Sequence, residues 1–161
     1  MHKINTAALL LIVILFITWS CGNSAYESKV DFKNGYWLWK EPVSFSFSID
    51  DASKKYDLSF FIRNSIDYEY QNLYIQYYLE NSNGYVMTEK LHNVIVFDPK
   101  TGKPVGNGMG DIYDIERTFL SGFSFDSAGE YKLRLDQFMR KDTLHNIQAI
   151  GLKISETAAM D

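Results

Sequence analysis

The segment RNSIDYEYQN, Arg63 to Asn72, carries side chains that suit binding. Tyr68 and Tyr70 are two residues apart, so on an extended segment both rings face the same side. Tyrosine and arginine are favoured anchors of protein interfaces, which makes an aromatic contact surface one interpretation. The other is a strand corner, where tyrosine hydroxyls and asparagine amides satisfy the loop backbone. The residues predicted from this segment to touch a partner or a glycan are Arg63, Asn64, Tyr68, Tyr70 and Asn72.

A second stretch, QFMRKDTLHNIQAIGLKI from Gln137 to Ile154, contributes one further candidate contact, Arg140. Arg140 follows an apolar run and has Asp142 two residues later, near enough to pair with it or to cap a turn. A paired charge is the usual way in which an arginine comes to lie near a core. The pattern therefore favours a buried structural polar cluster, with a contact role for Arg140 as the alternative.

The glycine-rich GNGMGD, Gly106 to Asp111, does not have the spacing of a phosphate-binding loop. It lacks the GxGxxG pattern, a following Lys-Ser or Lys-Thr pair, and the helix pattern that should come next. Glycines inside a strand pattern more often mark a bulge, a bend or a close approach of two backbones. We expect one of these three structural roles and no bound nucleotide.

The other side chains that catalysis or metal binding could use show no pattern that such a site requires. Asp98, Asp111 and Asp114 could offer oxygens to calcium, but about six to eight oxygens are needed and no EF-hand loop is present. His92 and His145 are far apart in the sequence, and the motifs HExxH and GxSxG are absent. We therefore predict no catalytic residue, no metal and no cofactor. A glycosidase pair of carboxylates is the one arrangement that sequence spacing does not reveal.

Alternating hydrophobic and polar residues indicate that β-strands position all these side chains. The strands recur about ten residues apart, with turn signals between them. The clearest alternating segments are 43–49, 56–63, 73–80, 131–136 and 150–154. No stretch of ten residues after the first 20 has a helical period, and segment 139–146 is expected to be irregular or a helical turn. The pattern predicts an all-β fold, an antiparallel β-sandwich that is jelly-roll-like.

Charge and aromatic content limit the classes of partner. The chain has 16 basic and 20 acidic residues, and without Lys3 the mature side chains carry a net charge of about −5. This balance argues against nucleic acid and against an anionic lipid surface. The 11 Tyr, 11 Phe and 3 Trp suit either a sandwich core or a carbohydrate platform, and composition alone favours the core.

The first 20 residues have the layout of a secretory signal and lead to the single cysteine, Cys21. Lys3 precedes an uncharged apolar run, residues 7–17, which is shorter than the roughly 20 residues of a transmembrane helix. A cysteine directly after a small residue resembles a bacterial lipobox, although Thr18 and Trp19 depart from its usual pattern. Lipidation of Cys21 is favoured over an uncleaved anchor and over a signal cut elsewhere, because it also removes an exposed thiol.

The predicted domain boundaries follow from these patterns. Residues 1–20 form a lipoprotein signal peptide, 21–36 a lipidated tether, 37–155 the β-sandwich and 156–161 a flexible tail. The tether is polar and has no sustained hydrophobic period, so no strand is expected there.

Three segments, together with the lipobox, resemble the gliding-motility lipoprotein family GldH of the Bacteroidetes. They are YDLSFFIRNSIDYEYQNLYIQYYL at 56–79, GKPVGNGMGDIYD at 102–114 and AGEYKLRLDQFMRKDTLHNIQAIGLKI at 128–154. The resemblance covers nearly the whole mature chain in the expected order. It implies an outer-membrane lipoprotein needed for gliding motility and linked to the type IX secretion machinery, with no assigned enzymatic activity.

From this resemblance we expect a non-catalytic assembly or scaffold component. Its partners would be other envelope or gliding lipoproteins or secretion machinery proteins, and the lipid anchor would hold it at the membrane. The alternative is a module that binds peptidoglycan or another envelope carbohydrate. Surface-exported lipoproteins of this group carry an acidic run after the cysteine, whereas this chain has Gly22 to Ala25 there. We therefore expect an outer-membrane location with the domain facing the periplasm.

Overall fold

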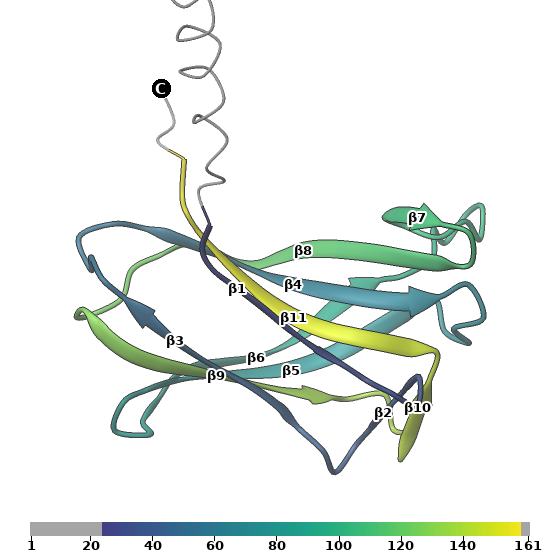
Figure 1. Ribbon diagram of the computed structural model, residues 1–161, viewed down its shortest axis with the longest axis horizontal. Helices are drawn as coiled ribbons and strands as arrows, with labels where there is room; N and C mark the ends of the chain where they lie inside the picture. Colours follow the sequence, from purple (N-terminus) through teal and green to yellow (C-terminus); the bar gives the residue numbers. More distant parts are fainter. Residues whose placement is uncertain (1–23, 159–161) are drawn as a thin grey trace, which may run out of the picture.

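The computed structural model describes residues 24–158, which form two antiparallel β-sheets packed face to face (Figure 1). The strands in this part of the chain are β1 Ser24–Asp31, β2 Tyr36–Leu38, β3 Val43–Ile49, β4 Tyr56–Ser65, β5 Asn72–Asn81, β6 Val86–Ile95, β7 Asn107–Met109, β8 Ile112–Phe123, β9 Gly129–Gln137, β10 Thr143–His145 and β11 Ile147–Glu156. Among these residues no helix is long and apolar enough to cross a membrane. The predicted signal peptide, Cys21 and residues 159–161 lie outside the described part of the chain.

The strand order of the two sheets agrees with the predicted fold. One sheet has the order β1-β11-β4-β8-β7 and the other β3-β9-β5-β6, while β2 and β10 form a separate two-stranded ribbon. Without the three-residue strands β2, β7 and β10, the long strands numbered in chain order are arranged 1-8-3-6 in one sheet and 2-7-4-5 in the other. This is the strand order of a jelly roll. The predicted all-β antiparallel sandwich is confirmed.

Alternation along the strands builds the core between the sheets. In β3 the four apolar residues are buried and the three serines between them are exposed. Each fully buried apolar side chain of this kind stabilises the fold by roughly 1.5–3 kcal/mol. Aromatic rings join the two sheets through the core, because Phe60 of β4 stacks on Phe119 of β8 with ring centroids 4.0 Å apart and Phe119 lies 4.8 Å from Tyr77 of β5. The fully buried large side chains include Trp37, Tyr77, Phe60, Leu58, Ile62, Leu73, Ile75, Leu79, Leu133 and Leu135.

The predicted tether is wrong for residues 24–36, because this segment opens the sandwich. β1 pairs along its length with β11, beginning with Ser24 opposite Ser155. It is an edge strand with mostly exposed side chains, so backbone hydrogen bonds hold it and its sequence shows no hydrophobic period. Its path requires Gly151 on β11, where a Cβ would lie 2.7 Å from the carbonyl oxygen of Ser28. The sandwich therefore begins three residues after the single cysteine.

The predicted flexible tail is also wrong at its first two residues. β11 extends to Glu156, and the Thr157 hydroxyl donates a hydrogen bond to Asp57 Oδ1 at 3.0 Å. The same Asp57 oxygen accepts hydrogen bonds from Ser121 Oγ and Gly122 N, both at 2.8 Å. Burial alone would raise the pKa of Asp57, but these hydrogen bonds lower it below its ordinary value. The start of β1 and the end of β11 consequently lie side by side at one end of the sandwich (Figure 1).

Candidate functional site

Tyr68 belongs to a strand corner, so the predicted aromatic platform is wrong for this residue. Its side chain is 4% exposed, and its hydroxyl donates a hydrogen bond to the carbonyl oxygen of Asn72 at 3.0 Å. Burial raises the pKa of Tyr68, which keeps the hydroxyl protonated as a donor. Tyr70 is partly buried and packs edge-on against Tyr68, with ring centroids 5.7 Å apart. The two rings stabilise the loop between β4 and β5 and do not present a flat surface to a ligand.

The two predicted asparagines have different surroundings. Asn64 is fully buried, and its Nδ2 donates a hydrogen bond to the carbonyl oxygen of Ser65 at 3.0 Å, which excludes direct contact with a partner. Asn72 Nδ2 donates to Asn93 Oδ1 at 2.8 Å, from β5 across to β6. Asn72 is partly exposed, so it remains a candidate contact on that face of the molecule.

Arg63 is a predicted contact residue that lines a groove. Its Nε and Nη2 donate to Oδ1 and Oδ2 of Asp114 on β8, both at 2.7 Å. The hydrogen bond from Arg63 lowers the pKa of Asp114 below its usual value. The groove has a volume of about 660 Å³ and lies over the five-stranded sheet. We name it the Arg63 groove, and its lining residues are Asp31, Phe32, Arg63, Asn107, Gly108, Met109, Ile112, Asp114 and Gln148.

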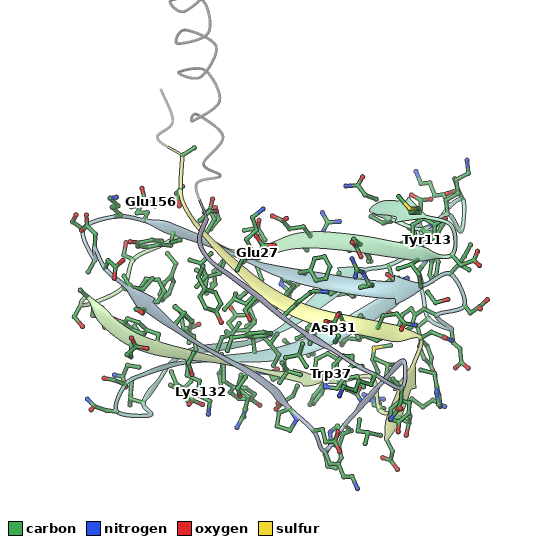
Figure 2. The ribbon with its side chains drawn as sticks, in the orientation of Figure 1. Glu27, Asp31, Trp37, Tyr113, Lys132 and Glu156 are labelled. Carbon is green, nitrogen blue, oxygen red and sulfur yellow. The ribbon has the colours of Figure 1, made fainter. Side chains whose placement is uncertain are left out.

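The glycine-rich segment supplies one wall of the Arg63 groove and confirms the expected close approach of two backbones. A Cβ at Gly106 would overlap the backbone of β8, and one at Gly108 would overlap the ring of Tyr113. The short strand β7 can therefore lie against β8, and Met109 projects from it with 90% of its side chain exposed. Tyr113 lies at the end of the sandwich opposite Glu156, which places the groove far from the ends of the described chain (Figure 2).

Arg140 is exposed in the loop between β9 and β10, so the predicted buried polar cluster is wrong. The ion pairs among residues 24–158 do not join it to Asp142. Its φ of 56° is a left-handed conformation that non-glycine residues rarely adopt. Residues 139–142 are irregular as expected, whereas the prediction is wrong for 143–145, which form β10 and pair with β2.

A cluster of exposed apolar side chains lies next to Arg140, on the outer face of the four-stranded sheet. Tyr74, Leu91 and Phe138 are 36%, 41% and 49% exposed. The backbone N–H of Phe138 donates to the carbonyl oxygen of Tyr74 at 2.8 Å, which joins the β9–β10 loop to β5. The cluster surrounds a hollow of about 440 Å³. We name it the Tyr74 patch, which consists of Tyr74, Leu91, Phe138, Met139 and Arg140.

The same outer face carries a cation over an aromatic ring. The guanidinium carbon of Arg134 lies 4.0 Å from the ring centroid of Tyr78, a favourable cation–π distance. Arg134 Nε and Asp136 Oδ1 are 3.6 Å apart, and burial raises the pKa of Asp136 more than this arginine lowers it. The face is therefore rich in tyrosine, phenylalanine, methionine and arginine, the residue types that are enriched in protein interfaces.

The sequence pattern does not reveal the partner of Arg63 or the Tyr74 patch. It offers Asp114 only as a calcium ligand, although this residue lies directly opposite Arg63 on the neighbouring strand. Alternation already pointed Tyr74 outward in the segment 73–80, but Leu91 and Phe138 come from two other elements. Their convergence depends on the order of the strands in the sheet, which no local sequence pattern contains.

The acidic residues considered as calcium ligands have other roles in the structure. Asp98 Oδ1 accepts hydrogen bonds from the backbone N–H groups of Lys100 and Thr101, at 3.0 and 2.7 Å, and so shapes a turn. Asp111 is exposed in the turn between β7 and β8. Within residues 24–158, no group of three or more His, Cys, Asp or Glu side chains is placed to hold a metal ion.

Comparison with known proteins identifies the family. The family model described as GldH lipoprotein matches residues 24–154. The chain belongs to the GldH lipoprotein family. It is 29% identical over 128 residues to the gliding motility lipoprotein GldH homolog of Christiangramia forsetii, covering 74% of this chain and 78% of the relative. It is 25% identical over 159 residues to the gliding motility lipoprotein GldH of Flavobacterium johnsoniae, covering 94% of this chain and 96% of the relative.

Membership of the GldH family confirms the resemblance inferred from the sequence. The family is linked to gliding motility and is not a known enzyme family, and a lipoprotein is attached to its membrane through lipid. Among solved structures, a chain from infectious bursal disease virus strain Gx aligns with 12% identity over 84% of this chain and 35% of that chain. Its TM-score of 0.29 is too low to show a shared fold.

Proposed function

We propose that this GldH-family protein is a non-catalytic assembly component of the gliding-motility and type IX secretion apparatus. Lipidated Cys21 holds it on the outer membrane with the sandwich on the periplasmic side, and the Tyr74 patch docks on another envelope protein. The observation that carries this proposal is the patch itself, where three large apolar side chains, each at least 36% exposed, surround a hollow beside Arg140.

The composition of the Tyr74 patch supports a protein partner. Contiguous exposed apolar patches mark sites of association, whereas exposed apolar residues scattered singly are normal. Tyrosine and arginine dominate the few residues that carry most of the binding energy in an interface. The left-handed backbone of Arg140 adds a further indication, because strained conformations of this kind concentrate at functional sites.

The position of the patch relative to the anchor supports a fixed docking platform. Only Gly22 and Asn23 separate Cys21 from β1, and three residue steps span at most about 11 Å. The patch lies where β5 begins and β9 ends, toward the end of the sandwich remote from the start of β1 (Figure 1). With the anchor at one end and the patch at the other, the sandwich presents the patch at a set height above the membrane.

The test is site-specific photo-cross-linking in living cells. A photoreactive residue in place of Tyr74 is expected to capture another gliding or secretion protein, identified by mass spectrometry. The matched control is the same residue at Lys132, which is exposed on β9 of the same sheet but nearer its other end (Figure 2). Equal capture at both positions, or capture only of unrelated proteins, would contradict the docking role.

The membrane leaflet is tested separately. A membrane-impermeant reagent that labels exposed lysines is expected to leave the protein unlabelled in intact cells and to label it once the outer membrane is opened. Strong labelling of intact cells would place the domain on the cell surface and overturn the periplasmic placement.

One observation favours glycan binding as a second candidate function. The Arg63 groove combines hydrogen-bonding side chains, among them Asp31, Asn107 and Gln148, with the apolar Phe32. Such a mixture suits a ligand with many hydroxyl groups and an apolar ring face. Retention of the protein on purified peptidoglycan, and its loss in a Gln148→Ala variant, would support this function. If the wild-type protein were not retained on peptidoglycan, this second candidate function would be contradicted.

A further inference from the structure

The sandwich has an open side between β6 and β8. In the four-stranded sheet β6 pairs only with β5, and in the other sheet β7 covers only the Ile112–Asp114 portion of β8. The opposite side of the sandwich is where β1 approaches β3. The free edges of β6 and β8 therefore border the same gap between the two sheets, and side chains on their inner faces point into it.

Three basic side chains point into this gap. Lys90 lies opposite the buried Tyr77, and His92 lies opposite the buried Ile75, so both face inward from β6. Arg117 lies opposite the buried Phe60, so it faces inward from β8. Lys90 and Arg117 are exposed at the opening, whereas His92 is half-buried. The ion pairs found within residues 24–158 involve other side chains, so no carboxylate neutralises this cluster.

An aromatic floor lies beneath His92, the most buried of the three basic groups. Phe60 stacks on Phe119 with centroids 4.0 Å apart, and the His92 ring meets Phe60 edge-on at 5.5 Å. Tyr77 lies 4.8 Å from Phe119. His92 therefore packs on a group of rings that joins the two sheets, and Lys90 and Arg117 lie near enough to lower its pKa, although the chain as a whole has a net charge of −4.

We propose that this opening, formed by Lys90, His92 and Arg117, binds the phosphate group of a ligand. Three donors that approach from two strands suit a tetrahedral anion with several oxygens better than a planar carboxylate, and arginine offers two-point hydrogen bonds to phosphate. The apolar part of the ligand would lie against Phe119, which is partly exposed, whereas the buried Tyr77 supports that ring from below. Neither the free anion nor a lipid headgroup is preferred by this chemistry, and the experiment separates them.

Inward-pointing charges on free strand edges also discourage edge-to-edge aggregation. That role requires a charge on each edge but does not require Lys90 and Arg117 to lie near the same histidine. Burial, together with the positive charges of Lys90 and Arg117, lowers the pKa of His92. A bound phosphate would oppose those charges and raise the pKa of His92. If the basic residues only prevented edge-to-edge aggregation, the pKa of His92 would not respond to phosphate.

The experiment is an NMR titration of the histidine side chains in the full-length protein in a non-ionic detergent. Inorganic phosphate and a short-chain phosphatidic acid are the two probes, each compared with chloride at equal ionic strength. His145 on β10 is the internal reference, because it lies in the separate β2–β10 ribbon. A response to both probes indicates a free phosphate group, and a response to phosphatidic acid alone indicates a lipid headgroup. Either response supports the site.

Variants of the exposed basic residues decide whether the response belongs to the opening. Arg117→Gln and Lys90→Gln are each expected to weaken the apparent affinity about tenfold, the loss of one charge-assisted hydrogen bond. Lys132→Gln, on the outer face, is expected to leave it unchanged. Each apparent affinity is taken from the change in the His92 signal between samples with and without the probe. This comparison is needed because removing a positive charge by itself raises the pKa of His92. A His92 response that chloride reproduces, that His145 shares, or whose apparent affinity is unchanged in Arg117→Gln would overturn the proposal.

Discussion

Arg63 and Asp114 lie directly opposite each other on β4 and β8 and form a two-point ion pair, with both N–O distances at 2.7 Å. The pair lies in the Arg63 groove with 35% and 36% of its side chains exposed. It links two strands whose residues are 51 positions apart in the sequence. The Nε and Nη2 donors of Arg63 are thus already used by Asp114 on the neighbouring strand. Any ligand in the groove therefore meets an ion pair of small net charge.

This ion pair is expected to contribute a small, pH-dependent share of the stability. Because about a third of each side chain is exposed, solvent screening limits the coupling to about 0.5–1 kcal/mol. The pKa of Asp114 is lowered in the folded protein, so the contribution is present above the unfolded value of about 3.9 and is lost as the pH falls through the folded value. A double-mutant cycle with Arg63→Gln and Asp114→Asn, measured by urea unfolding near pH 7 and again near pH 3, checks this. Coupling of equal size at both pH values would contradict it.

Tyr68→Phe is expected to destabilise the fold by about 1 kcal/mol, because it removes the donor to a carbonyl oxygen at a buried corner. Tyr70→Phe is the matched control and should change the free energy of unfolding by less than about 0.5 kcal/mol. Urea unfolding of both variants measures the difference. If Tyr68→Phe left stability unchanged but weakened recovery of a partner, the corner would be a contact surface after all.

The sequence predicts the strands whose side chains alternate and misses those that do not. β3, with four buried apolar residues separated by exposed serines, is located to the residue at 43–49. β1 is not predicted because it is an edge strand. Such a strand needs only backbone hydrogen bonds to one neighbour, so its sequence carries no alternating apolar face. The signal for it lies elsewhere, in Gly151, whose lack of a Cβ lets β1 approach β11.

The candidate surfaces depend on information that a local pattern does not carry. Arg63 and Tyr68 are close in the sequence, yet one lies in a groove and the other in the core. The difference arises because successive residues of a strand face opposite sides, and because the chain turns sharply after β4. The Tyr74 patch joins β5, β6 and the end of β9, so it exists only once the strand order is known.

Gly151→Ala is expected to weaken the attachment of β1 to the sheet. The added methyl group would lie 2.7 Å from the Ser28 carbonyl oxygen, so one backbone must move, at a cost of about 2–3 kcal/mol. Hydrogen exchange should rise in residues 24–31 while β4 and β5 stay protected. Gly84→Ala is the control, because it meets no neighbour and adds only the strain of its φ of 75°, about 1 kcal/mol. Unchanged protection of β1 in Gly151→Ala would show that the sheet absorbs the methyl group.

Lengthening the link between Cys21 and β1 tests whether the height of the sandwich above the membrane matters. A flexible insertion of about ten Gly and Ser residues after Asn23 adds a mean reach of roughly 17 Å, which is more than the native link can span. Stability and membrane attachment should not change, because the insertion precedes β1. We expect gliding, or secretion in a host that does not glide, to fall strongly. The control is the same insertion after Ala158, which follows β11 and the hydrogen-bonded Thr157 and leaves the link to β1 intact. Full activity with the long link would show that the lipid anchor supplies attachment alone and does not set the position of the Tyr74 patch.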